Sequence, residues 1–81
     1  MDDTIREVLA AHGRLARDAA SLDRHANLYE AGLTSHASVT VMLALEDAFD
    51  VEFPDRLLTK ATFSSIAAIE AALAEASAVS A

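Results

Sequence analysis

The side chains with the clearest chemical potential stand together at residues 32–36, which read GLTSH. Two hydroxyls, those of Thr34 and Ser35, directly precede a strongly helical stretch, and either one can cap its N-terminus. Because the free N–H groups and the dipole at a helix N-terminus favour anions, a phosphate ester on Ser35 would also be stabilised there. The residue types therefore allow two roles for Ser35, a structural cap or a site of covalent modification.

Other chemistry has little support in the sequence. His12, His25 and His36 are too widely spaced for a helical metal site, and His12 falls in an apolar stripe, which predicts a packed or half-buried side chain. The acidic cluster between Glu46 and Asp55 does not match a calcium loop and is either a solvated face or a docking surface for a basic partner. Cysteine and a glycine-rich phosphate cradle are both absent. We therefore expect neither a metal site nor an enzymatic activity.

Composition narrows the class of protein further. The 81 residues suit one small domain, and thirteen acids against six bases give a formal net charge of −7. Such a surface repels nucleic-acid phosphates and anionic membranes, so neither is expected as a partner. The apolar runs are too short to span a bilayer, the N-terminus is acidic, unlike a signal peptide, and there is no cysteine. We expect a cytoplasmic monomer.

Two long helices are expected to flank the GLTSH segment and its approach. Apolar residues recur at helical spacing over 3–17 and again over 35–50, which predicts a helix in each range. The chain between them, 18–34, lacks this period and predicts an unusually long loop. The core stripe expected on the second helix consists of Val41, Met42, Leu45 and Phe49.

The C-terminal third of the chain predicts two more helices. Pro54 stops or restarts the chain, and the residues after it suffice for a short helix over 55–60. Thr62 can cap a last helix over 63–75. The core stripe of this helix is expected to consist of Phe63, Ile66, Ile69 and Leu73. The sequence thus predicts an all-α fold, a small four-helix bundle in a single domain over 1–81.

Three stretches are similar to the acyl and peptidyl carrier protein superfamily, and together they cover nearly the whole chain. They read NLYEAGLTS at 27–35, SVTVMLALEDAFDVEFP at 38–54 and TFSSIAAIEAAL at 62–73. The resemblance implies that Ser35 carries 4′-phosphopantetheine and that Gly32 matches the glycine of the family's loop. It also implies a four-helix bundle that holds a thioester on the thiol of this flexible arm. A phosphopantetheinyl transferase would install the arm, so the carrier itself needs no general base.

Two residues depart from the usual pattern of the superfamily. Thr34 stands where an aspartate is usual, and that aspartate is expected to help the transferase bind its metal ion. His36 stands where a leucine is usual. A carrier with this TSH sequence resembles the small stand-alone aminoacyl carrier proteins. These are loaded by amino acid:carrier protein ligases related to the catalytic core of class II seryl-tRNA synthetases. The resemblance implies that such a ligase forms an aminoacyl adenylate from ATP and transfers a small amino acid to the arm thiol, and that an acyl-transfer enzyme acts downstream.

Under this resemblance, the helix face beside Ser35 is the candidate surface for partner contact. Its residues are Thr34, His36, Val39, Thr40, Leu43, Glu46 and Asp47. Val39 and Leu43 could instead be ordinary core residues, and His36 a solvated residue of the first turn. Two other functions stay open: an acyl or peptidyl carrier of a polyketide, fatty-acid or nonribosomal-peptide pathway, and a helical interaction domain that is never modified.

Overall fold

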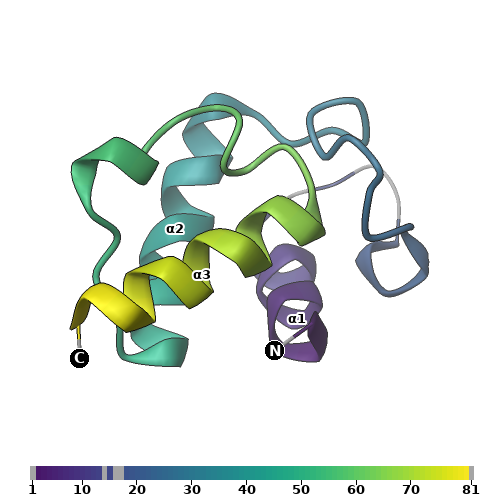
Figure 1. Cartoon of the computed structure of the whole chain (residues 1–81). Helices are drawn as coiled ribbons and strands as arrows, with labels where there is room; N and C mark the ends of the chain where they lie inside the picture. The colour runs from purple at the N-terminus through teal and green to yellow at the C-terminus, as the bar shows by residue number, and fades with distance from the viewer. Residues whose placement is uncertain (1, 14, 16–17, 81) are drawn as a thin grey trace.

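The computed structural model describes residues 2–13, 15 and 18–80, and in this part of the chain it is all-helical, without strands (Figure 1). Three α-helices alternate with two short 3₁₀ helices. In chain order they are α1 (Asp2–His12), η1 (Ala19–Ser21), α2 (Ser35–Phe49), η2 (Asp55–Leu57) and α3 (Ile66–Ser80). None of the helices described is long and apolar enough to cross a membrane. The all-α prediction is confirmed.

The predicted fourth helix is not present as an α-helix. In place of a helix over 55–60, the described chain has only the single turn η2. Pro54 precedes this turn in an extended conformation and supplies no side-chain cap, and Leu58 follows it with φ −86° and ψ 64°, outside the helical region. One uncapped turn bounded in this way cannot extend, so the architecture is three α-helices joined by loops with 3₁₀ turns.

Helix α1 is shorter than the predicted 3–17. It ends at His12, and the Gly13 N–H donates to the carbonyl of Leu9 at 2.8 Å. A Cβ at Gly13 would lie 2.7 Å from that carbonyl oxygen, so a glycine is required at this close approach. Residues 14, 16 and 17 of the predicted helix lie outside the described residues. The expectation that His12 is packed is wrong: it occupies the exposed last turn of the helix.

Helix α2 follows its prediction closely, whereas α3 does not. Asp50, the predicted last residue of α2, is instead its C-cap, in the left-handed conformation at φ 53°. Helix α3 begins at Ile66 rather than at 63, because the Ser65 hydroxyl, and not that of Thr62, accepts the backbone N–H of Ala68, at 3.1 Å. It continues past 75 to Ser80, through an alanine-rich stretch with high helix propensity.

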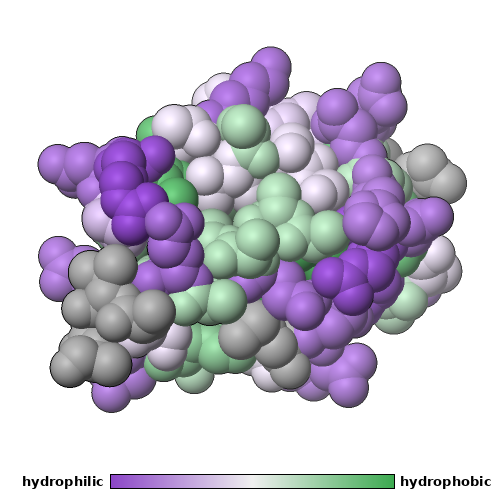
Figure 2. Space-filling view, in the orientation of Figure 1, coloured by the Kyte–Doolittle hydropathy of each residue, from purple (hydrophilic) through white to green (hydrophobic). Residues whose placement is uncertain are grey.

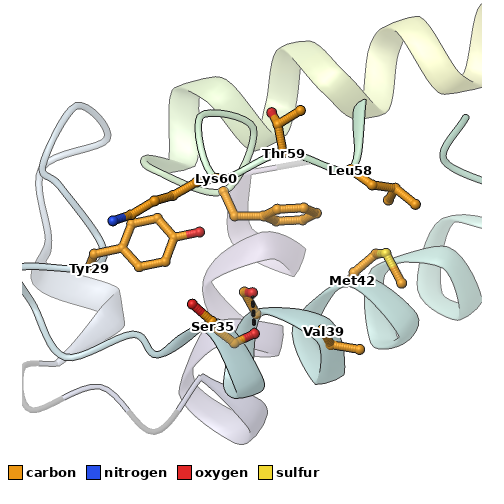
Figure 3. A pocket seen from close by; sticks show the side chains of 9 residues that line it. Tyr29, Ser35, Val39, Met42, Leu58, Thr59 and Lys60 are labelled. Atoms are coloured by element: carbon orange, nitrogen blue, oxygen red, sulfur yellow. Dashed lines mark hydrogen bonds between the residues drawn. The ribbon is translucent and has the colours of Figure 1, made fainter. Parts of the chain in front are cut away.

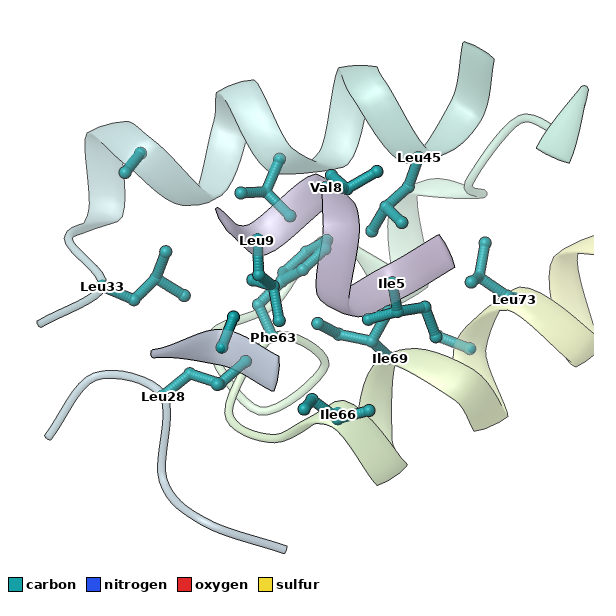
Figure 4. Close-up of a cluster of buried hydrophobic side chains, with 14 of the residues drawn as sticks. Ile5, Val8, Leu9, Leu28, Leu33, Leu45, Phe63, Ile66, Ile69 and Leu73 are labelled. Atoms are coloured by element: carbon teal, nitrogen blue, oxygen red, sulfur yellow. The ribbon is translucent and has the colours of Figure 1, made fainter. Parts of the chain in front are cut away.

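The hydrophobic core lies where α1 meets the other two α-helices (Figure 4). Val41 and Leu45 of the predicted α2 stripe are buried, whereas Met42 and Phe49 are only partly buried. The whole predicted stripe of the last helix is buried, namely Phe63, Ile66, Ile69 and Leu73. In the view of Figure 2, apolar residues gather over the middle of α3, with near-neutral residues above them and hydrophilic residues toward both sides.

The long loop before α2 is fixed to both α1 and α3. The Arg6 guanidinium of α1 donates to the carbonyls of Ala19 at 2.9 Å and Leu22 at 2.6 Å, and it pairs with the Asp2 carboxylate. Further along, the Leu28 N–H donates to the Ser64 carbonyl at 2.7 Å, just before α3. These bonds satisfy backbone groups that helix or sheet would otherwise pair, and they fix the direction from which the chain enters α2.

Candidate functional site

Ser35 is the first residue of α2, and its side chain is exposed. The residue before it, Thr34, is the N-cap: its backbone is extended, and its hydroxyl accepts the N–H of Ala37 at 3.0 Å. The two hydroxyls that the sequence left as alternative caps therefore have different roles. Thr34 caps the helix, and within the described chain the Ser35 hydroxyl makes no hydrogen bond, so it is available for reaction.

The turn that delivers Ser35 depends on a glycine and two buried leucines. Gly32 has φ 117°, a backbone conformation that side chains with a Cβ rarely adopt. On either side of the turn, Leu28 and Leu33 are buried, and the N–H of Leu33 donates to the carbonyl of Leu28 at 2.9 Å. The turn is thus anchored in the core while the next two residues reach the surface, which explains why Ser35 is held outward at a defined place.

A cavity of about 300 Å³ opens directly beside Ser35 (Figure 3). One wall is the flank of α2, and the other comes from the loop before α2 and from the segment between η2 and α3. The lining residues are Tyr29, Ser35, Ser38, Val39, Met42, Leu58, Thr59, Lys60 and Phe63. Sequence periodicity did not predict this cavity, because its walls combine the loop before α2, α2 itself and residues 58–63, and no helical period links these segments.

The candidate partner residues of α2 lie on one side of the helix. At about 100° per residue, positions 35, 36, 39, 40, 43, 46 and 47 fall within an arc of about 140°. Val39 and Leu43 are 53% and 56% exposed, so the alternative that they are core residues is wrong. His36, Thr40 and Asp47 are exposed as well, and Thr34 is exposed next to Ser35. An apolar pair is therefore presented to solvent near the Ser35 hydroxyl, between polar residues.

Glu46 has a structural partner, as the N-cap Thr34 has, whereas no side-chain hydrogen bond is described for the other residues of this face. Its carboxylate accepts the backbone N–H of Phe53 at 2.8 Å, across the turn that follows α2. The other side of the face is defined by a second cavity, of about 370 Å³, which His36 and Thr40 line together with His12 of α1. The predicted face thus extends from the α1 side of α2 to the cavity beside Ser35, and two of its members, Thr34 and Glu46, also make hydrogen bonds that belong to the fold.

Ligands for a metal ion are not gathered at this site. In the described ranges 2–13, 15 and 18–80, no three His, Cys, Asp or Glu side chains are placed to hold an ion. What the arrangement offers is one exposed hydroxyl at the positive end of a helix dipole, next to a mostly apolar cavity. These features define a small helical domain that presents an unbonded serine hydroxyl beside a mostly apolar cavity.

Comparison with known families identifies this class more closely. The family described as PP-binding, phosphopantetheine attachment site, matches residues 3–73, and the chain belongs to this family. An aminoacyl carrier protein from Agrobacterium fabrum is 53% identical over 70 residues, which cover 86% of this chain and 84% of that protein. Proteins of this kind are carriers and not enzymes.

Solved structures show the same relationship. One is a carrier protein from Agrobacterium tumefaciens in a crystal structure with an engineered Bradyrhizobium japonicum glycine:carrier protein ligase and AMP. It matches with a TM-score of 0.88 and 50% identity, and the match covers 91% of this chain and 99% of that chain. A solution structure from Agrobacterium tumefaciens matches with a TM-score of 0.74 and 49% identity, covering 93% of this chain and 90% of that chain. The resemblance to stand-alone aminoacyl carrier proteins is confirmed.

Proposed function

We propose that this protein, as one carrier domain over 1–81, holds an aminoacyl group as a thioester on a 4′-phosphopantetheine arm attached to Ser35. The observation that carries the proposal is the exposed Ser35 hydroxyl at the start of α2, which is left unbonded because Thr34 caps the helix. Membership of the phosphopantetheine-attachment family and 53% identity to an aminoacyl carrier protein support the same function.

The residues around Ser35 suit an attached phosphodiester. Esterification of an exposed, unbonded hydroxyl breaks no contact of the fold. The N–H groups of Ser35 and His36 have no acceptor within α2, since the first turn of a helix leaves them unpaired, and they lie at the positive end of the helix dipole. In attachment, the Ser35 oxygen forms a bond to the phosphorus of the phosphopantetheine donor while the bond from that phosphorus to the donor's leaving group breaks, and the transferase must accept the hydroxyl proton. The arm would supply the thiol that this cysteine-free chain lacks.

The proposed loading partner is a seryl-tRNA-synthetase-like amino acid:carrier protein ligase. It is supported by the structural relative that was crystallised with a glycine:carrier protein ligase. On this chain, the proposed contact surface is the arc of α2 with its N-cap, that is Thr34, His36, Val39, Thr40, Leu43, Glu46 and Asp47, all exposed except the half-buried Glu46. The transferase and a downstream acyl-transfer enzyme would approach the same end of α2, because both must reach Ser35 or its arm. We propose a monomer in the cytoplasm, where ATP is available to the ligase.

Intact mass spectrometry tests the attachment site. We expect the wild-type protein to gain the mass of phosphopantetheine when co-expressed with a broad-specificity phosphopantetheinyl transferase. Ser35→Ala should gain nothing, while Ser38→Ala, the matched control one turn along α2, should still be modified. A mass gain that persists in Ser35→Ala would refute the site, and no gain in the wild type would favour an unmodified interaction domain.

The cargo is tested separately, with the modified protein. We expect it to form a thioester with an amino acid when it is incubated with ATP, the twenty amino acids and a synthetase-like ligase. The Ser35→Ala variant serves as the control for non-enzymatic labelling. Thioester formation only with fatty acyl or polyketide-type groups and their loading enzymes would instead support the acyl carrier alternative.

A further inference from the structure

The second cavity, on the α1 side of α2, is bordered by two histidines from different helices. His12 ends α1, and His36 stands in the first turn of α2, which packs against α1. Both residues line the cavity of about 370 Å³, and both are exposed. Among the described residues, neither imidazole has a hydrogen-bond or ion-pair partner. Both are therefore available to a group that enters the cavity from outside.

The rest of the cavity wall consists of hydroxyl and methyl groups. Thr34 and Thr40 contribute the hydroxyls, and Ala11 and Ala37 contribute the methyl groups. The Thr34 hydroxyl accepts the N–H of Ala37, so its own proton can still be donated. None of the acids in the described ranges lines the cavity. Protonated imidazoles and hydroxyls all donate hydrogen bonds, so the lining favours a ligand that accepts them and is negatively charged.

Charge is distributed unevenly along α2. His36 is the only residue of this helix that can become positively charged, and no residue of 34–45 is acidic. The acids begin with Glu46 and Asp47, about 15 Å or more along the helix axis from His36. Three other acids flank the two histidines in sequence without lining the cavity, namely Glu7, Asp18 and Glu30. The histidine end of α2 is thus set apart from its acidic end.

We propose that this cavity receives a carboxylate side chain of the loading ligase, with His12 and His36 as its hydrogen-bond donors and counter-charges. The inference rests on the proposed function. It extends the ligase interface from α2 to α1 and names the chemical group on the ligase. A ligase is the occupant supported by the relative that was crystallised with a glycine:carrier protein ligase. Because Thr34 and His36 flank Ser35 in the chain, a side chain seated here would align the ligase with the attachment site.

The two ends of α2 would then select opposite charges on the ligase. The end with Glu46 and Asp47 suits a basic group, and the end with His36 suits an acidic one. A ligase that matches both ends can dock in one direction only, because the reversed orientation would bring like charges together. The charge pattern would therefore fix the direction in which the ligase lies along α2.

Loading kinetics of histidine variants test the inference. Modified wild type, His12→Gln, His36→Gln and the matched control His25→Gln are each loaded with glycine by a glycine:carrier protein ligase and ATP at about pH 6, where histidine is partly protonated. His25 is exposed and lines neither cavity. We expect His12→Gln and His36→Gln each to raise KM roughly 1.4- to 5-fold, as for a surface ion pair, with kcat unchanged. His25→Gln should keep the wild-type KM, and urea denaturation checks that every variant is folded.

Variants of opposite charge test the sign of the group on the ligase. His36→Glu should raise KM more than His36→Gln does, because two carboxylates would meet, whereas His36→Lys should keep a low KM. In the wild type, KM should rise between about pH 6 and about pH 8 as the imidazoles lose their charge. The rise should be smaller in the double variant with glutamine at both 12 and 36, which is subject to the same titration of the ligase itself.

Equal KM values for the wild type and the double variant, or a lower KM in His36→Glu, would overturn the inference and leave attachment and loading intact. If the same variants slow the transferase but not the ligase, the cavity serves a different partner, and the inference is also overturned. A wild type that is modified at Ser35 but loaded by no ligase of this kind would refute the proposed function together with the inference.

Discussion

Replacing Thr34 by alanine should destabilise the fold, whereas replacing Ser35 by alanine should not. Thr34→Ala removes the hydroxyl that accepts the Ala37 N–H at 3.0 Å and leaves that group of the first turn of α2 to solvent. Loss of an N-cap costs about 1 kcal/mol, within a range of about 0.5–2 kcal/mol. A domain of 81 residues has a free energy of unfolding of roughly 4–12 kcal/mol, so the change is a measurable fraction of the total. Ser35 makes no such bond, and Ser35→Ala should stay within about 0.5 kcal/mol of the wild type.

Urea denaturation followed by circular dichroism measures this difference. For a loss of about 1 kcal/mol, the unfolding midpoint of Thr34→Ala should fall by roughly 0.3–1 M urea with an unchanged m-value. The thermal midpoint should fall by about 4–8 °C. Thr34→Ser and Thr34→Asp keep a capping oxygen and should retain most of the stability. Co-expression with the transferase should still add phosphopantetheine to Thr34→Ala, because the reacting hydroxyl remains.

The opposite ranking would refute the reasoning. If Ser35→Ala loses as much stability as Thr34→Ala, then Ser35 contributes to the helix terminus and its hydroxyl is not free for esterification. If neither variant loses stability, water replaces the cap without cost, and the unbonded state of Ser35 no longer distinguishes it from Thr34. In either case the structural basis for choosing Ser35 as the attachment site fails, whatever the family resemblance implies.

Two further predictions concern the packing and the acidic face. Phe49→Ala should lower the free energy of unfolding by less than the roughly 3–5 kcal/mol typical of a buried phenylalanine, because Phe49 is only partly buried. Phe53 is buried, so Phe53→Ala should reach that range. Equal losses of unfolding free energy in urea would contradict this difference in burial. Glu46→Gln should lower the free energy of unfolding by about 1 kcal/mol, because it weakens the hydrogen bond that the Phe53 N–H donates to this side chain. Asp47→Asn should leave stability unchanged and slow loading by a ligase. Unchanged loading kinetics in Asp47→Asn would remove this residue from the interface.

Apolar periodicity predicted the helices that bury an apolar stripe, but it did not predict helix ends that depend on local backbone geometry. Apolar spacing alone predicts the burial of Val41 and Leu45 on α2 and that of the last stripe, Phe63, Ile66, Ile69 and Leu73. Apolar spacing gave no sign that α1 stops at Gly13, which depends on a close approach to a carbonyl. Nor did it show that the chain after Pro54 forms only one turn, since the same residues are compatible with a short α-helix and with a 3₁₀ turn.

The candidate site was predicted in part. A capping position and a family motif together pointed to Ser35, and the exposure of Val39 and Leu43 agrees with the predicted face. The structure was needed to decide which of the two adjacent hydroxyls caps α2, because Thr34 and Ser35 are equally suitable caps by residue type. Lys60 was missed because its relation to the site is purely tertiary, through a cavity wall that no sequence spacing describes.

The bond between Glu46 and Phe53 limits how far the α2 face can be transplanted. Grafted onto another helical carrier to confer a new partner, Val39, Leu43 and Asp47 would transfer as surface residues, since each is exposed in this fold. Glu46 would transfer only together with the turn whose N–H it accepts. In this protein the acidic pattern is therefore not freely exchangeable. A designer who wishes to redirect the carrier can vary Val39, Leu43 and Asp47 independently, but must treat Glu46 as belonging to the scaffold.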